Sequence, residues 1–226
     1  MGSAQRPAAY EPLADQMYEV LLDQFMDGTR AAGEPLSIGA LARELNVSQT
    51  PLREALARLE TTGLVRREAL KGYRVAPLLS RKEVSKLFDA RLLLEPALAR
   101  ETGLRTTPEF LDELREAVED LERSVEHADS SPEGFRLYWT SDARLHALIA
   151  EQCDNPFLEM IYRTLSVQAQ RFRLFSKLGR TGAAFAAVEH RAIYEALAAR
   201  DADGAAEKMR EHLTNSRQRN VLTRDP

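Results

Sequence analysis

Three of the four histidines and one aspartate are spaced so that they could bind a metal ion. Asp142 and His146 are four residues apart, which places both side chains on one face of a helix, one turn apart. His190 and His212 each lie eleven residues from Asp201, at the predicted turn between the last two helices. Positions equidistant from the turn of an antiparallel helical hairpin face each other, here about 16 Å from the turn. We therefore expect the two imidazoles to meet, and a third helix could add Asp142 and His146.

One carboxylate and three imidazoles suit zinc, nickel, cobalt or manganese, and they leave positions open for water or a ligand carboxylate. The alternative is three unrelated histidines on amphipathic helices, and spacing alone does not decide between the two. An open metal site could also activate water, so a metal-dependent enzyme acting on a small organic acid is a rival function. No spare histidine or glutamate is clearly placed as its general base. A helical adaptor, with or without a structural metal, is a third alternative.

The composition is that of a folded, globular chain. Of its 226 residues, 44% are hydrophobic and 29% are charged, which predicts one or two domains and excludes disorder as the default state. The single cysteine, Cys153, excludes an internal disulfide, and we expect it to be buried and structural. No apolar run approaches the roughly 18 residues that span a bilayer, and the N-terminus has no signal-peptide pattern. We therefore expect a soluble, cytoplasmic protein with no membrane role.

The elements that must position the four candidate ligands are helices that begin after Pro77. Ser80 and Glu83 form a capping box that opens a long helix through Glu101. Further helices are predicted over 107–127, 131–152, 155–177, 182–200 and 203–220. We expect the terminal arginines to be a solvated helix end; they are Arg217, Arg219 and Arg224.

The first 77 residues have a different pattern. Helices are predicted over 10–27, from Ser37 to about 46, and from Ser48 to Thr61, with Gly63 as the stop of the last. Two short strands, 64–67 and 73–75, flank a Lys71-Gly72 turn and predict a β-hairpin. Two short helices, a tight turn and a hairpin are the layout of a winged helix-turn-helix.

Charge and shape both favour nucleic acid as the partner of this first part. The whole chain has a net charge of −4, but residues 43–81 hold eight basic and four acidic residues, a local net charge of +4. The helix that starts at Ser48 could enter the major groove, where Gln49, Thr50 and Arg53 would reach bases or phosphates. The alternative is a helical hairpin with solvated arginines.

Residues 36–75 read LSIGALARELNVSQTPLREALARLETTGLVRREALKGYRV. This segment resembles the DNA-binding domain of the GntR superfamily of bacterial transcription regulators, and its VSxTPLREAL core is specific. The resemblance implies DNA contacts on the recognition helix and the wing: Ser48, Gln49, Thr50, Arg53, Lys71 and Gly72. The family usually has an arginine where Gln49 stands, and some members have one where this chain has Gly39. Glutamine pairs best with adenine and arginine with guanine, so both departures affect base preference.

The later part of the chain contains ARLLLEPALA, SDARLHALIAEQCDNPFLE and EHRAIYEALAARDADGAAEKMREHL. These stretches resemble the FCD effector-binding domain, which defines the FadR subfamily. The resemblance implies an antiparallel bundle of six or seven helices that binds a divalent metal and a small organic acid. Its implied ligands are Asp142, His146, His190 and His212, with zinc favoured over nickel, cobalt or manganese. Arg91 occupies the place of an arginine that helps to bind the acid, although it could instead pair with Glu95 one turn away.

The sequence therefore predicts a mainly α protein of two domains. Residues 9–77 form a winged helix-turn-helix that binds double-stranded operator DNA, and residues 80–222 form an antiparallel all-helical bundle. We expect the bundle to bind the metal and a small carboxylate metabolite, and to form a homodimer that reads two half-sites. We expect a ligand-responsive repressor rather than an enzyme.

Overall fold

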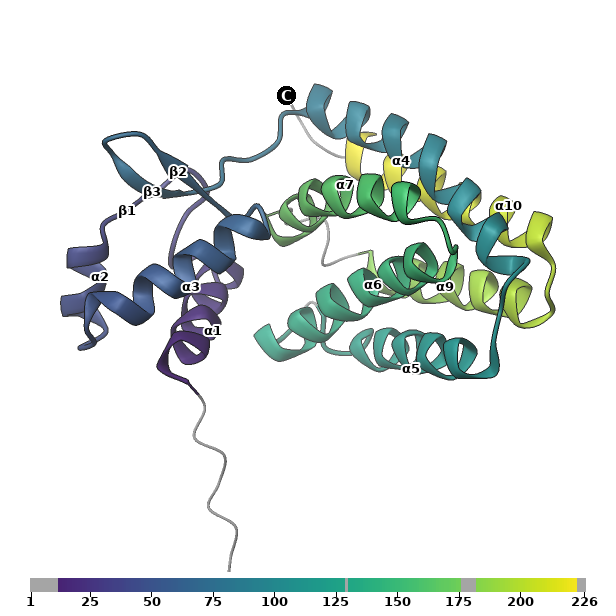
Figure 1. Ribbon diagram of the computed structural model, residues 1–226, viewed down its shortest axis with the longest axis horizontal. Helices are drawn as coiled ribbons and strands as arrows, with labels where there is room; N and C mark the ends of the chain where they lie inside the picture. Colours follow the sequence, from purple (N-terminus) through teal and green to yellow (C-terminus); the bar gives the residue numbers. More distant parts are fainter. Residues whose placement is uncertain (1–11, 129, 176–181, 223–226) are drawn as a thin grey trace, which may run out of the picture. The chain divides into compact units, whose positions relative to one another are not determined.

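The computed structural model describes residues 12–128, 130–175 and 182–222. The chain divides into two compact units, Met1–Pro77 and Leu78–Pro226. The described residues are mostly helical, and their strands form one small sheet in the first unit (Figure 1). This architecture agrees with the predicted fold class. In the described part of the chain, no helix combines the length and the apolar character that crossing a membrane requires.

The first unit is a three-helix cluster with a small sheet. Its helices are α1 (Leu13–Met26), α2 (Ile38–Glu44) and α3 (Gln49–Thr61). Its strands are β1 (Pro35–Leu36), β2 (Val65–Glu68) and β3 (Gly72–Val75), in the order β1-β3-β2 with both pairs antiparallel. The predicted hairpin is present, one residue later than expected at its first strand. The sequence prediction missed β1, because two residues are too few to show an alternating pattern.

Local sequence signals explain how α2 and α3 are set against each other. Ser37 caps α2 by accepting a hydrogen bond from the Ala40 amide at 3.4 Å. Asn46 then takes a left-handed conformation, with φ of 52°, which asparagine tolerates better than most residues. The inward stripe of α3 is completely buried: Leu52, Ala55, Leu56 and Leu59. On the opposite face of α3, residues such as Arg53 and Glu54 are exposed.

The second unit is a bundle of helices. They are α4 (Arg81–Gly103), α5 (Pro108–Ser124), α6 (Pro132–Gln152), α7 (Pro156–Phe175), α9 (Ala183–Ala198) and α10 (Ala202–Leu222). Side chains of Ser80, Thr107 and Ser131 cap α4, α5 and α6, and the predicted capping box of Ser80 with Glu83 is complete. The predicted end of α7 at Lys177 lies outside the described residues. Helix α5 ends at Ser124, earlier than predicted, because a turn follows in which the His127 amide bonds to the Ser124 carbonyl.

Close packing between helices fixes the bundle. Helices α4 and α10 lie side by side, and α9 and α10 form a hairpin (Figure 1). At Gly103 the two backbones approach so closely that an added Cβ would lie 2.7 Å from Ala202 Cα. Cys153 is 1% exposed and belongs to the main core, as expected of a structural thiol.

The prediction of a solvated end for α10 is wrong where the structure describes it. Arg217 donates to Ser85 Oγ at 2.8 Å and forms an ion pair with Asp89 at 2.9 Å, both on α4. Arg219 binds Glu189 on α9. These contacts arise because α10 packs along its neighbours to its last turns. Arg224 lies outside the described residues.

Candidate metal centre and nucleic-acid interface

Asp142, His146, His190 and His212 converge in the interior of the helical unit. Each offers one donor atom, and these atoms all lie within 4.8 Å of one another. All four side chains are buried, with at most 2% of each residue exposed. The first two come from α6, and the others come from α9 and α10. The α9–α10 hairpin does bring the last two histidines together, with ring centres 4.4 Å apart and ring planes tilted by 53°.

The spacing of these donors fits a metal ion. His190 Nε2 lies 3.3 Å from His212 Nε2 and 3.7 Å from Asp142 Oδ1. Two Zn–N bonds of about 2.0–2.1 Å at a tetrahedral angle would place their nitrogens about 3.3 Å apart. Three imidazoles and one carboxylate are also the donor types that zinc and its neighbours prefer. The residues present therefore fit a divalent transition metal.

Burial favours the neutral form of His146 and His190, which is the form that a metal requires. Desolvation lowers the pKa of His146 to about 4, against the partial opposition of Glu95. Desolvation, reinforced by His212 and His146, lowers the pKa of His190 well below its ordinary value. Since a metal binds only an unprotonated imidazole nitrogen, both rings are ready to coordinate at neutral pH.

Charged side chains surround the four donor residues and form a second layer around them. The contacts of His146 are one example. His146 Nδ1 lies 2.6 Å from Glu95 Oε2. Arg91 donates from Nε to Glu95 Oε1 at 2.5 Å, and its Nη2 lies 3.5 Å from His146 Nε2. Burial raises the pKa of Glu95, but Arg91 and His146 outweigh it and hold that pKa well below its usual range. The intrahelical pairing of Arg91 with Glu95 is therefore present, beside the cluster itself.

The other two carboxylates of the site are also paired with arginines. Arg173 Nη2 on α7 lies 2.7 Å from Asp142 Oδ2, and both residues are buried. Glu189 Oε2 lies 2.8 Å from His212 Nδ1, and Arg219 binds both oxygens of Glu189 at 2.7 and 2.8 Å. Hydrogen bonds from Arg219 and His212 outweigh the effect of burial and lower the pKa of Glu189 to about 2. Each carboxylate thus has one guanidinium partner, and their charges cancel.

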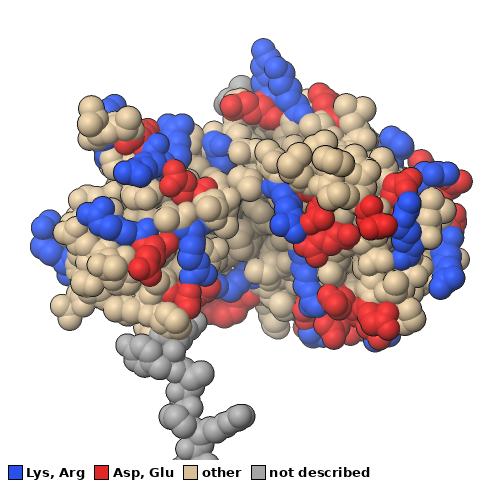
Figure 2. Space-filling view, in the orientation of Figure 1, with Lys and Arg blue, Asp and Glu red and all other residues tan. Residues whose placement is uncertain are grey.

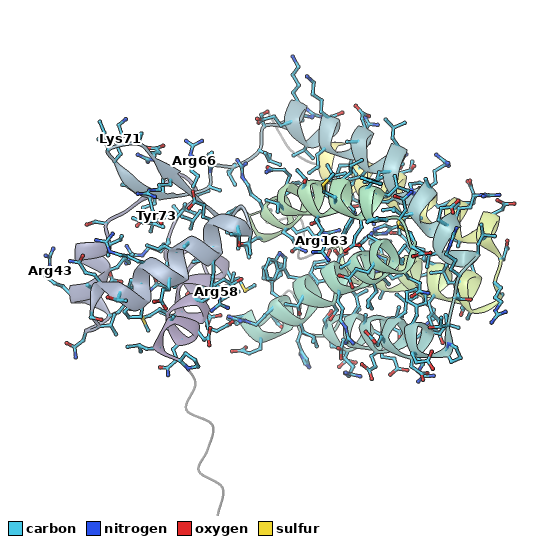
Figure 3. All side chains as sticks on the ribbon, in the orientation of Figure 1. Arg43, Arg58, Arg66, Lys71, Tyr73 and Arg163 are labelled. Carbon is cyan, nitrogen blue, oxygen red and sulfur yellow. The ribbon has the colours of Figure 1, made fainter. Side chains whose placement is uncertain are left out.

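The first unit presents polar residues where the sequence predicted DNA contacts. Ser48, Gln49, Thr50 and Arg53 are all exposed at the start of α3, and Arg53 Nη2 donates to Gln49 Oε1 at 3.2 Å. Lys71 and Gly72 are exposed on the hairpin, where Gly72 has a φ of 86°. Figure 3 shows Lys71 at the wing and Arg43 at the end of α2, both pointing outward. In the face shown in Figure 2, basic side chains lie along the wing and the outer edge of this unit, with acidic ones between them.

Arg43, which was not among the residues predicted to contact DNA, lies next to them on the surface. With residues of the helix-turn-helix it lines a shallow hollow of about 510 Å³: Gly39, Ala42, Asn46, Val47, Ser48 and Gln49. The hollow spans the tight turn and the first residue of α3, so Arg43 extends the polar face beyond the recognition helix. In the sequence, the only indication of this position was that Arg43 belongs to the basic segment 43–81.

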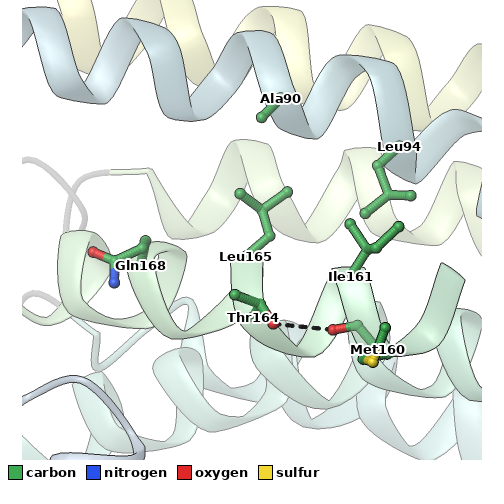
Figure 4. Close-up of a pocket in the computed structure, with 7 residues that line it drawn as sticks. All are labelled: Ala90, Leu94, Met160, Ile161, Thr164, Leu165 and Gln168. Carbon is green, nitrogen blue, oxygen red and sulfur yellow. Dashed lines mark hydrogen bonds between the residues drawn. The ribbon is translucent and has the colours of Figure 1, made fainter. Parts of the chain in front are cut away.

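An apolar face on α4 and α7 is not explained by the core. Leu93 is 83% exposed, and Met160 and Ile161 are more than half exposed. The close-up in Figure 4 shows the groove between the two helices, which has a volume of about 470 Å³. Its lining is almost entirely apolar: Ala90, Leu94, Met160, Ile161, Thr164, Leu165 and Gln168.

Both parts of the chain match described protein families. Residues 13–75 match "Bacterial regulatory proteins, gntR family", and residues 86–215 match "FCD domain". The chain belongs to the FCD subgroup of the GntR family of bacterial transcription regulators. The HTH-type transcriptional repressor GlaR of Escherichia coli is 31% identical over 202 residues, covering 87% of this chain and 90% of that protein.

Two further proteins are similar to this chain along most of its length, the second of them in its fold. The uncharacterized HTH-type regulator YdhC of Bacillus subtilis is 24% identical, covering 88% of this chain and 87% of that protein. A crystal structure described as a GntR regulator from Rhodococcus has a TM-score of 0.72 at 20% identity, covering 94% of this chain and 99% of that one. The matched families and relatives are transcription regulators, which supports a regulator rather than the hydrolase or lyase alternative.

The sequence did not predict most of the charged residues that surround the four donors of this GntR-family chain. Glu95 was noted only as a partner for Arg91, and Arg219 was expected in solvent. Glu189 had one available signal, its position directly before His190. Arg173 had none, since nothing local in the sequence connects it to Asp142, 31 residues earlier.

Proposed function

We propose that this GntR-family regulator is a repressor whose helical unit binds a divalent metal ion and a small carboxylate effector. The observation that carries the proposal is the buried convergence of Asp142, His146, His190 and His212, with donor atoms within 4.8 Å of one another. We assign metal and effector binding to residues 80–222 and DNA binding to residues 9–77. Zinc is the first candidate, with nickel, cobalt and manganese as alternatives.

The charges around the cluster support an anionic effector. The three carboxylates of the site are matched by three arginines, and burial favours the neutral forms of His146 and His190. A divalent ion would therefore bring two positive charges into the interior without a counter-charge, which is costly unless an anion accompanies it. A carboxylate that coordinates the metal would supply one of the two negative charges needed. Arg91, with Nη2 at 3.5 Å from His146, is the proposed second contact of that carboxylate.

The exposed start of α3 and the hairpin support the proposed DNA contacts. Gln49 and Arg53 are already joined by a hydrogen bond on the exposed face, so we propose that they read the major groove together. Ser48 and Thr50 would add contacts to bases or phosphates, and Lys71 and Gly72 would lie along the backbone or in the minor groove.

The apolar face on α4 and α7 supports a homodimer. Residues as exposed as Leu93, Met160 and Ile161 are costly in water, and a second copy of the same face would cover them. A dimer places two recognition helices on one DNA molecule, which is how regulators of this layout read a pseudo-palindromic site. The effector must bind one arrangement of the dimer better than another in order to act as a switch.

Elemental analysis of the purified protein, without chelator, tests the metal proposal. We expect about one divalent metal per chain in the wild type and none in a His190→Ala/His212→Ala double variant. His127→Ala is the matched control, because His127 is exposed and outside the cluster. Small carboxylates are then screened by thermal shift, where a binder raises the apparent stability. Absence of metal, even after zinc or nickel is added, would refute the proposal and leave the DNA-binding assignment standing.

A further inference from the structure

A glutamate that is not among the four donors connects two helices of the metal cluster. Glu189, on α9, reaches His212 Nδ1 on α10 at 2.8 Å through Oε2. Arg219 donates to both of its oxygens, and Asn215 Nδ2 donates to Oε1 at 3.0 Å. The side chain of Glu189 is only 15% exposed. Three donors from one helix therefore hold this carboxylate in a single orientation.

The hydrogen bond from His212 determines which of its ring nitrogens is free. A neutral imidazole carries one proton, and a carboxylate can only accept, so Nδ1 donates and Nε2 keeps its lone pair. Nε2 is the atom that lies 3.3 Å from His190 Nε2, on the side of the other donors. We propose that Glu189, fixed by Arg219, is the positioning residue that aims His212 Nε2 at the metal. This inference rests on the proposed metal site.

An amide in place of the carboxylate would disturb this arrangement. Arg219 presents N–H groups to both oxygens of Glu189, and His212 presents a third. A glutamine must turn its own NH₂ group toward one of these donors. If it faces His212, it donates to Nδ1 and stabilises the ring proton on Nε2, the nitrogen that the metal requires.

The same contacts tie the metal centre to the end of α10. Asn215 and Arg219 follow His212 by three and seven residues, which places all three on one face of the helix. A bound metal would fix the position of His212. Glu189 contacts His212, Asn215 and Arg219, so these contacts together would restrain the last turns of α10. Metal binding should therefore slow amide hydrogen exchange over residues 213–220.

The test compares Glu189→Gln with Glu122→Gln in the full-length protein, using Zn²⁺ alone as the probe. Glu122 on α5 is the matched control, because it accepts from Arg191 of α9 at 2.8 and 2.6 Å but touches no histidine of the cluster. Zinc affinity is measured by competition with a chelator. We expect Glu189→Gln to bind zinc about 10–100-fold more weakly than the wild type, and Glu122→Gln to stay within about twofold.

Hydrogen exchange gives the second measurement. Zinc should protect residues 213–220 in the wild type and in Glu122→Gln but not in Glu189→Gln. Wild-type affinity in Glu189→Gln, or an equal loss in both variants, would overturn the inference while leaving the metal site in place. If the wild type itself binds no zinc, the proposed function is refuted, and this inference with it.

A milder variant covers the case in which Glu189→Gln does not fold. Arg219→Gln keeps the bond between Glu189 and His212 but removes the two guanidinium donors. We expect a loss of zinc affinity smaller than that of Glu189→Gln. Unchanged zinc affinity and unchanged protection of α10 in this variant would overturn the role of Arg219.

Discussion

Mild acid should destabilise the metal-free helical unit before its carboxylates begin to take up protons. Burial lowers the pKa of His146 to about 4 and that of His190 well below its ordinary value. In the unfolded chain, histidines protonate near pH 6.5. Below that pH the unfolded state therefore binds protons that the folded state does not, and stability falls as pH decreases. Glu95 and Glu189 have lowered pKa values too, so their contribution is lost only below about pH 4.5.

The size of this loss of stability follows from the pKa shift of His146. A histidine that titrates at about 4 when folded and about 6.5 when unfolded costs roughly 2 kcal/mol of stability between pH 7.5 and pH 5. The full shift corresponds to about 3 kcal/mol and is reached near pH 4 and below. His190 adds to the loss in the same direction.

The single tryptophan makes the assay specific for the helical unit. Trp139 is buried on α6, and its Nε1 donates to the Gln170 carbonyl at 3.3 Å. Its fluorescence should follow urea unfolding of this unit in the presence of a chelator, at fixed protein concentration, at pH 7.5 and pH 5.0. His146→Gln should reduce the difference between the two pH values by about 2 kcal/mol. His127→Gln should leave it unchanged. Equal wild-type stability at both pH values would refute the reasoning.

Four other predictions follow from single contacts. Arg173→Met removes the partner of a buried aspartate and should destabilise the metal-free protein by about 3–5 kcal/mol in urea unfolding, with partial recovery in zinc; no loss would show that the pair is dispensable. Gly103→Ala forces the backbones of α4 and α10 apart and should cost about 1–3 kcal/mol by the same assay. Arg53→Ala removes a proposed major-groove contact and should weaken operator binding by about 1–3 kcal/mol at every salt concentration in fluorescence anisotropy; unchanged affinity would refute its role. Ile161→Asp places a charge on the exposed apolar face and should yield monomers in sedimentation; a persistent dimer would locate the interface elsewhere.

Sequence patterns predicted those parts of the molecule that depend on local rules. Ser80 and Glu83 predicted the start of α4, because a capping box is formed by residues that are three positions apart in the sequence. The convergence of His190 and His212 was predictable from their equal distance to a turn. The contacts of Arg173 with Asp142 and of Arg219 with Glu189 were not, because they depend on which faces of distant helices pack together. Exposed helix ends and packed helix ends have the same residue types, which is why the end of α10 was misjudged.

The α9–α10 hairpin also limits how the length of this chain can vary. His190 lies eight residues before the end of α9 at Ala198, and His212 lies ten residues after the start of α10 at Ala202; these lengths bring the two histidines together. One residue inserted into either arm would rotate the histidine beyond it by about 100° and shift it by about 1.5 Å, away from the other donors. The number of residues between the two histidines therefore cannot change without moving them apart. Relatives that keep both histidines are expected to place their insertions and deletions outside the segment between them.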